Sequence, residues 1–239
     1  MLNNNSAEDA IARGLPAPSA RALKDASYGA FAAVARAMGS APRLELLDLL
    51  VQRPFTVDAL ARGIARPFPS TSQHLQVLRR ANLVTTRRIG TSIEYALAPG
   101  VSDVLVALRR LATVRSAEVQ RATQEWFAEA GAPETIDRDA LLPLLRQDGA
   151  VLVDVRPPDE YDRGHIAGAI NVPVDCLVDR ILELPHDALI VATCRGPYCA
   201  FAADAVRILR SHGLKAVRFE DGVAEWEVDG GAIASSTAP

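Results

Sequence analysis

Residues 188–211 read ALIVATCRGPYCAFAADAVRILRS: an apolar run, a short loop with Gly and Pro, and an Ala-rich amphipathic segment. The apolar run predicts a buried strand, and the segment from about Ala200 to Ser211 predicts a helix. A strand that leads through such a loop into a helix points successive backbone N–H groups into one small cup, at the positive end of the helix dipole. We expect this cup to be formed by the backbone of Arg195, Gly196, Pro197, Tyr198 and Cys199.

Cys194 lies at the mouth of the predicted cup, and Cys199 follows five residues later. A helix N-terminus and a neighbouring Arg lower the pKa of a cysteine below the free value of about 8.5, and the thiolate is the nucleophilic form. Cys194 is therefore a candidate nucleophile, and Cys199 a candidate partner for it. Two other interpretations stay open: half of a zinc site, with Cys176 as the only further cysteine, or two buried small apolar side chains.

An upstream segment, VLVDVRPPDEYDRGHIAGAINVP at residues 151–173, precedes this loop. The two segments together resemble the rhodanese family, whose hallmark is a strand with Asp-x-Arg, Glu-Tyr, Gly-His-Ile-x-Gly-Ala and Asn-x-Pro, followed by a strand and a Cys-headed loop. The resemblance covers residues 137–233. It implies that Asp154 and Arg156 support the loop and that His165 is structural.

Strands alternate with helices across this half of the chain. We expect strands at residues 151–155, 188–192 and 215–219, and helices at residues 178–184 and 200–211. This alternation predicts an α/β domain with a doubly wound parallel sheet, whose ligand crevice lies at the carboxyl ends of the strands. Cys194 falls at that edge.

The resemblance also implies a chemistry for the loop. The Cys194 thiolate would attack the outer sulfur of thiosulfate or another sulfane donor, hold it as a persulfide, and release it to a thiol, with Arg195 attracting the anionic donor. A phosphatase of this fold needs an Arg six residues after the cysteine, and Ala200 stands there. Phosphatase and arsenate reductase activities of that type are therefore disfavoured.

Cys199 is a feature that a plain transferase does not need. It can attack the persulfide, leaving a disulfide and releasing hydrosulfide, if the two Cα atoms lie within roughly 7 Å. If its side chain points into the core instead, Cys199 is only packing. For Cys176 we expect a structural role.

Length and charge divide the chain of 239 residues into two domains. Residues 1–130 carry 16 Lys and Arg against 11 Asp and Glu, whereas residues 131–239 carry 10 against 18. A basic half joined to an acidic half indicates that only the first half contacts a polyanion. Three cysteines, no signal peptide and no long apolar run predict a cytoplasmic protein without a membrane span.

The basic half has the pattern of a winged helix-turn-helix. Residues 26–38 and 42–51 predict two buried helices, Thr56 caps a short third, and residues 70–80 predict the recognition helix, with Leu75, Val77 and Leu78 on its apolar side. Residues 83–97 alternate around a Gly turn and predict the hairpin wing. From Ala59 to Ile93 there are six Arg and no acidic residue.

The basic residues coincide with the recognition helix and the wing, so we expect them on double-stranded promoter DNA. Residues 26–121 resemble the ArsR-type winged-helix repressors through Ser-x-Gln-His-Leu-x-Val-Leu-Arg-x-Ala-x-Leu-Val and a basic wing. The resemblance implies a homodimer through the first and last helices, the last being one long helix from Val101 to about Ala130. The expected base-edge contacts are Ser70, Thr71, Ser72, Gln73 and His74, and the expected phosphate contacts are Arg79, Arg80, Arg87 and Arg88.

We expect no metal in this half, because the cysteine pair and last-helix His ligands of the metal-responding members are absent. No cofactor is expected either. The predicted organisation is a flexible segment at residues 1–25, a mainly α winged-helix DNA-binding and dimerisation domain at 26–130, and a rhodanese-like domain at 131–235.

Three functions fit this organisation. The first is a transcriptional regulator whose rhodanese domain senses a small sulfur or redox species through a persulfide or disulfide at Cys194. The second is a thiosulfate-type sulfurtransferase enzyme that carries a DNA-binding domain. The third is a repressor whose second domain serves assembly only. We favour the first.

Overall fold

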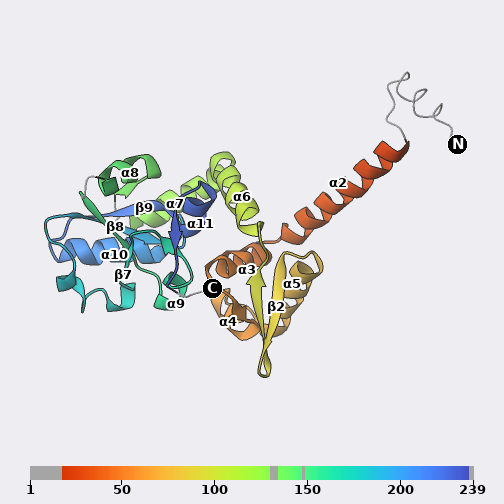
Figure 1. Ribbon diagram of the computed structural model, residues 1–239, viewed down its shortest axis with the longest axis horizontal. Helices are drawn as coiled ribbons and strands as arrows, with labels where there is room; N and C mark the ends of the chain where they lie inside the picture. The colour runs from red at the N-terminus through yellow and green to blue at the C-terminus, as the bar shows by residue number, and fades with distance from the viewer. Residues whose placement is uncertain (1–17, 130–133, 147–148, 237–239) are drawn as a thin grey trace, which may run out of the picture. The chain divides into compact units, whose positions relative to one another are not determined.

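The computed structural model describes residues 18–129, 134–146 and 149–236 (Figure 1). The chain divides into two compact units, one spanning Met1–Leu47 and Phe55–Ala98, the other spanning Asp48–Pro54 and Pro99–Pro239. The boundary between them passes through one helix, α3 (Ala41–Gln52). The predicted domain junction near Gly131 and most of the predicted flexible segment lie outside the described residues.

The first unit is the winged helix-turn-helix that the sequence predicts. A three-stranded antiparallel sheet of order β1-β3-β2 carries the wing, and α4 and α5 form the helix-turn-helix. Its elements are α2 (Pro18–Met38), the first part of α3, β1 (Phe55–Thr56), α4 (Val57–Gly63), α5 (Phe68–Arg80), β2 (Val84–Ile89) and β3 (Ser92–Leu97).

Local signals set the ends of these elements. Thr56 is the N-cap of α4, and its hydroxyl accepts a hydrogen bond from the Ala59 N–H at 3.4 Å, as predicted. Gly90, at φ +58°, makes the hairpin turn. The recognition helix α5 begins at Phe68, two residues earlier than predicted, because Pro67 takes the N-cap position and Pro69 fits the first turn.

The predicted long last helix is wrong. It breaks at Ser116 into α6 (Val101–Arg115) and α7 (Ala117–Glu129). Ser116 has extended backbone angles, φ −108° and ψ 106°, and its hydroxyl accepts a hydrogen bond from the Val119 N–H at 3.2 Å. A serine that caps the following helix therefore outweighs the continuous apolar pattern.

The second unit contains the predicted parallel sheet. Five strands lie in the order β4-β9-β8-β5-β7, and every pairing is parallel. The strands are β4 (Thr135–Ile136), β5 (Ala150–Asp154), β7 (Ile170–Asn171), β8 (Leu189–Cys194) and β9 (Ala216–Gly222), and a small antiparallel pair joins β6 (His165–Ile166) to β10 (Ile233–Ala234). The helices are α6, α7, α8 (Arg138–Arg146), α9 (Pro158–Tyr161), α10 (Ala200–Ser211) and α11 (Val223–Val228).

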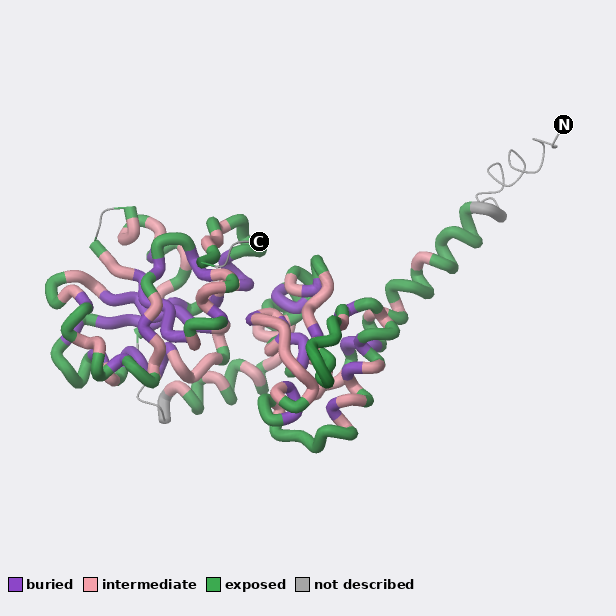
Figure 2. Tube along the Cα trace, turned by 60° about the horizontal axis from the view of Figure 1, so that its bottom comes forward, coloured by how far each residue is buried: buried purple, intermediate pink, exposed green. Residues whose placement is uncertain are grey.

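Two apolar clusters cover the two faces of this sheet. Along β8, Ile190 and Ala192 pack with Val206 and Leu209 of α10, whereas Val191 points to the opposite cluster with Leu141, Phe219 and Trp226. This is the period-two alternation of a strand that is buried on both faces. Figure 2 shows the buried residues concentrated along these strands.

The predicted helix at residues 178–184 is wrong. The segment contains one short 3₁₀ turn, Ile181–Glu183, and another, Val174–Cys176, precedes it. Leu177 and Leu184 are buried while Leu182 is 84% exposed, so the apolar residues do not share one α-helical face. None of the described helices is long and apolar enough to cross a membrane.

Candidate active site and nucleic-acid interface

The cysteine loop lies at the carboxyl end of β8, the middle strand of the sheet. β8 ends at Cys194, and α10 begins at Ala200 with Cys199 as its N-cap residue. The carboxyl end of a central parallel strand is where ligands bind in open α/β sheets. The predicted strand–loop–helix unit is therefore present, with the helix bounds as expected.

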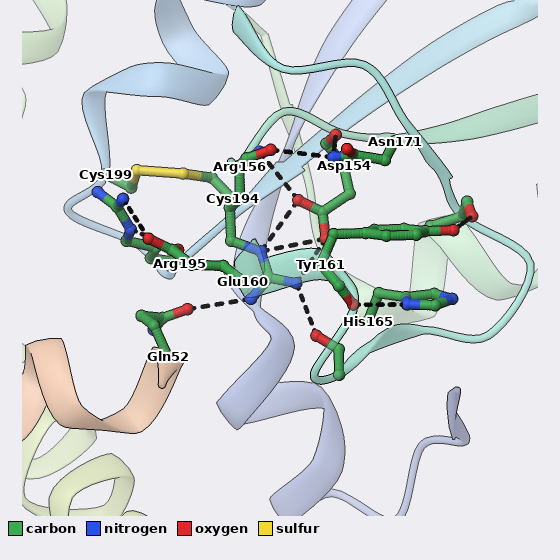
Figure 3. Close-up of polar contacts among 12 residues, drawn as sticks. Gln52, Asp154, Arg156, Glu160, Tyr161, His165, Asn171, Cys194, Arg195 and Cys199 are labelled. Atoms are coloured by element: carbon green, nitrogen blue, oxygen red, sulfur yellow. Dashed lines mark hydrogen bonds and ion pairs between the residues drawn. A yellow bond between two sulfur atoms is a disulfide. The ribbon is translucent and has the colours of Figure 1, made fainter. Parts of the chain in front are cut away.

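The two cysteines of the loop are joined. Cys194 and Cys199 form a disulfide with a Cα–Cα distance of 6.4 Å (Figure 3). Cys194 is 2% exposed, and Cys199 also packs against the cluster beneath α10. Cys176 is a free, exposed thiol, so the expected structural role for it has no support in packing.

The predicted backbone cup is smaller than expected. Pro197 has no N–H to donate, and the Cys199 N–H donates to the Gly196 carbonyl at 3.1 Å. Arg195, Gly196 and Tyr198 remain from the predicted set. Gly222 of β9 fixes the position of the loop, because a Cβ on it would lie 2.4 Å from the carbonyl carbon of Arg195.

Arg195 has a carboxylate partner that the sequence reasoning did not assign. Its Nε donates to Glu160 Oε2 at 2.8 Å and its Nη2 to Oε1 at 2.6 Å, and its guanidinium lies 4.8 Å from the Phe201 ring centroid. Glu160 is 3% exposed. This pair compensates the charge of Arg195, and it ties the cysteine loop to α9. Attraction of an anionic donor by Arg195 stays a prediction.

Asp154 and Arg156 form a buried ion pair at the end of β5. The Arg156 Nη2 donates to Asp154 Oδ2 at 2.6 Å and to the Gly164 carbonyl at 2.7 Å, and its Nη1 donates to Gln52 Oε1 at 3.0 Å. Asp154 and Arg156 are 0% and 1% exposed. Asn171 donates to both of their carbonyl oxygens, at 3.0 and 2.9 Å, which ties the end of β5 to β7.

His165 lies apart from the sulfur atoms (Figure 3). Its ring stacks on Tyr161 with centroids 3.7 Å apart, and its Nδ1 lies 2.8 Å from the Tyr161 carbonyl oxygen. It is 6% exposed. These contacts agree with a structural role.

Sequence reasoning passed over Glu160, Asn171 and Gln52. The first two lie within the quoted Glu-Tyr and Asn-x-Pro signature, so the signal was present without an assigned partner. Gln52 ends α3 and belongs to the same compact unit as Arg156. No local signal pairs two residues that are so far apart in the chain.

The predicted DNA-contact residues lie on α5 and on the wing, but one of them is misassigned. Thr71 is fully buried, and its hydroxyl donates to the Pro67 carbonyl at 3.1 Å, so it cannot meet a base edge. Val77, predicted on the apolar side, is 36% exposed. Gln73 is exposed, and Ser70, Ser72 and His74 are half-buried.

The four predicted phosphate-contact arginines, Arg79, Arg80, Arg87 and Arg88, are all exposed. Arg87 is already paired with Glu94 across the hairpin, at 3.0 Å. Burial lowers the pKa of His74, and the nearby charges of Arg43 and Arg66 lower it further. The lowered pKa favours the neutral form of the His74 ring.

Comparison with known proteins agrees with this two-part structure. Residues 137–229 match the family model of the rhodanese-like domain. The chain is 41% identical over 201 residues to the HTH-type transcriptional regulator Rv0324 of Mycobacterium tuberculosis, across 83% of this chain and 88% of that protein. A shorter match, 47% identical over 64 residues, links 27% of this chain to 49% of the HTH-type transcriptional regulator KmtR of the same organism.

The rhodanese side has its own relative, the Thiosulfate sulfurtransferase GlpE of Pseudomonas paraeruginosa. That match is 40% identical over 50 residues, 21% of this chain and 46% of that protein. The long match to Rv0324 covers most of both chains. The chain therefore belongs to the HTH-type transcriptional regulators, and it carries a winged helix in its first unit and a rhodanese-like domain at residues 137–229.

Proposed function

We propose that this regulator senses sulfane sulfur through Cys194 and Cys199 and changes its DNA binding in response. The observation that carries the proposal is the pairing of the two sulfurs at the carboxyl end of β8, with Cα atoms 6.4 Å apart. In a chain that also carries a winged helix, a loop with two interconvertible covalent states is suited to act as a switch.

The chemistry needs no external oxidant. The Cys194 thiolate attacks the outer sulfur of a sulfane donor, a Cys194 persulfide forms, and the donor leaves as its thiolate, or as sulfite when the donor is thiosulfate. The Cys199 thiolate then attacks the Cys194 sulfur and expels hydrosulfide. The two thiols are oxidised to the disulfide while the transferred sulfur is reduced, so electrons balance.

The cysteine loop and the neighbouring Glu225 contact helix α6 within the second unit. The Tyr198 hydroxyl lies 2.6 Å from the Thr113 hydroxyl, and Glu225 beside the loop pairs with Arg109. A change between thiol, persulfide and disulfide alters the loop that positions Tyr198. In this proposal α6 receives the signal.

The same helix supports a homodimer. Four apolar side chains of α6 are exposed at helical spacing, and α2 exposes three more. They are Val104, Leu108, Leu111 and Val114 on α6, and Leu23, Tyr28 and Phe31 on α2. A second copy that covers these residues would place two recognition helices on two half-sites of one operator.

Intact mass and DNA affinity, measured together, test the sensor. Reduced wild type, Cys194→Ser and Cys199→Ser are each treated with polysulfide or thiosulfate and titrated onto a promoter fragment. Wild type should lose about 2 Da and change its affinity, whereas Cys199→Ser should gain about 32 Da and stop at the persulfide. A wild-type affinity that is unchanged after disulfide formation contradicts the proposal.

Peroxide treatment is the comparison arm. A peroxide oxidises Cys194 to the sulfenic acid, which condenses with Cys199 to the same disulfide and releases water. If peroxide switches DNA binding and polysulfide does not, the signal is an oxidant and not sulfane sulfur.

A sulfurtransferase enzyme is the second candidate, favoured by the match to GlpE. It predicts many sulfite molecules released from thiosulfate per protein chain when a thiol acceptor is supplied. If Cys194→Ser abolishes that turnover and leaves the regulation of DNA binding intact, the domain serves as an enzyme.

A further inference from the structure

A cavity of about 340 Å³ lies beside the cysteine loop, and all the residues that line it belong to the second unit. Its walls come from α6, α7, the end of β9, and Pro197 and Tyr198 of the loop. Cys199 lines a different cavity, of about 240 Å³, and Arg109 and Tyr198 line both. The larger cavity is therefore a neighbour of the sulfur site, with its own lining.

Arg218 is the buried cation of this cavity. It is 4% exposed, its Nη1 donates to the Pro197 carbonyl at 3.1 Å, and its guanidinium lies 4.4 Å from the Phe127 ring centroid. Its Nε is buried without a hydrogen-bond partner, and within the described residues no carboxylate lies within 4 Å of it. Burial lowers the pKa of Arg218, against the raising effect of Glu220 and Asp221.

A buried guanidinium without a counter-ion favours the binding of an anionic acceptor. Removing a cation from water without a counter-ion is costly, and an unmet buried donor adds to that cost. A carboxylate on a ligand would supply the missing counter-charge, because guanidinium groups bind carboxylates with favourable geometry.

Asp221 lines the same cavity, and it is an acidic side chain with other carboxylates nearby. Burial raises its pKa to about 6, the carboxylates of Glu225, Glu220 and Asp229 raise it as well, and Arg110 lowers it. Within the described part of the chain Asp221 has no ion pair, because the two other arginines of the lining are engaged. Arg109 binds Glu225 and Asp48, and Arg110 binds Asp229 at 2.7 Å. An ammonium group would relieve this crowding of negative charge.

We propose that this cavity binds a small zwitterion of the amino-acid class, with its carboxylate on Arg218 and its ammonium group toward Asp221. Gln120, Thr123 and Gln124 supply further polar groups, and Val114 an apolar surface for a side chain. The bound molecule contacts Pro197 and Tyr198 and so strengthens the loop in the position where Tyr198 meets Thr113. This inference stands whether or not Cys194 senses sulfur.

The test uses the full chain and defined probes. Each proteinogenic amino acid, β-alanine and γ-aminobutyrate are screened singly at about 10 mM by thermal shift, and hits are titrated by calorimetry. Propionate carries only the carboxylate and ethylamine only the ammonium group. At least one amino acid should bind saturably, with propionate and ethylamine each about tenfold weaker or more.

Substitutions of the lining residues test where the ligand binds. Arg218→Gln and Asp221→Asn should each weaken the hit about tenfold or more, while Arg146→Gln, an exposed arginine on α8, should not. Cys194→Ser should bind the hit with the affinity of the reduced wild type, which separates this site from the sulfur chemistry. If Arg218→Gln fails to fold, the effect of Asp221→Asn and the affinities of propionate and ethylamine still test the proposal.

Two results overturn the proposal. One is the absence of any saturable hit in the panel. The other is propionate that binds as tightly as the best amino acid while Asp221→Asn has no effect, because the site would then take simple carboxylates.

Discussion

Glu160 holds Arg195 through two hydrogen bonds, at 2.8 and 2.6 Å, and so fastens the cysteine loop to the start of the rhodanese signature. Glu160 is buried on α9, and Arg195 directly follows Cys194. The pair anchors the residue that follows Cys194 to α9. We therefore expect its loss to loosen the loop that carries Cys194 and Cys199.

Replacing Glu160 with Gln should destabilise the protein by about 1–2 kcal/mol, because a buried carboxylate is lost while the partly exposed Arg195 can turn to water. Urea denaturation of the reduced protein measures the effect, and the rate of disulfide formation should fall with it. Glu183→Gln, which breaks the exposed pair with Arg180, is the matched control and should leave stability unchanged. Equal effects of the two variants would show that the Glu160 pair does not hold the loop.

Asp154→Asn should be the more damaging change. It leaves the fully buried guanidinium of Arg156 without its counter-ion, at a cost of about 3–5 kcal/mol. Thermal and urea unfolding check this, with Asp204→Asn on the exposed face of α10 as the control. A loss below 1 kcal/mol, on the same order as an exposed pair, would mean that Gln52 and Gly164 suffice to hold Arg156.

Two substitutions on α5 should change different properties. Thr71→Val should change the stability of the protein, and Gln73→Ala its recognition of the operator. Thr71→Val removes the buried hydroxyl that donates to Pro67 and should cost about 1 kcal/mol of stability with no change in base preference. Gln73→Ala should weaken binding to the operator about tenfold and leave non-specific binding and stability unchanged. Fluorescence anisotropy with specific and scrambled duplexes distinguishes them. A Thr71→Val variant with altered base preference would contradict the buried position.

The wing arginines should differ in their contribution to the salt dependence of DNA binding. Arg88→Gln should reduce the slope of log affinity against log salt by about 0.9, the value for one phosphate contact. Arg87→Gln should reduce it less, since Arg87 is partly neutralised by Glu94 at 3.0 Å. Arg146→Gln serves as the control. If the two wing variants give the same slope as wild type, the wing does not lie on phosphates.

Asp221 should make stability depend on pH. Its folded-state pKa of about 6 lies above its ordinary value of 3.8, so its contribution is fully present below 3.8 and is lost as the pH rises through 6. Relative to wild type, Asp221→Asn should therefore gain stability between pH 4 and pH 7.5, by about 1 kcal/mol once solvent screening is allowed for. Asp187→Asn, at an exposed position, should show no such trend. Parallel curves for Asp221→Asn and wild type would contradict the raised pKa.

Helices and strands whose signals are local can be predicted from the sequence. The strand predicted at residues 188–192, observed at Leu189–Cys194, and the Ala-rich helix at 200–211 follow from period and composition, which act over a few residues. The signature at residues 151–173 and the basic helix and wing identified both halves. Asp154 and Arg156, which the signature contains, are buried and paired, and their role as support of the loop stays a prediction.

The other features depend on contacts between residues that are far apart in the chain. The 3₁₀ turns after Pro173 depend on which apolar side chains find a partner, and a one-dimensional pattern does not contain that information. The break at Ser116 is different, because the serine cap is a local signal that the apolar periodicity hides. Glu160, the partner of Arg195, and Gln52, one of the partners of Arg156, lie 35 and 104 residues away from them in the chain. The cavity around Arg218 exists because β9, α6, α7 and the loop converge on it. Charge compensation and burial act through space, and only the folded chain sets those distances.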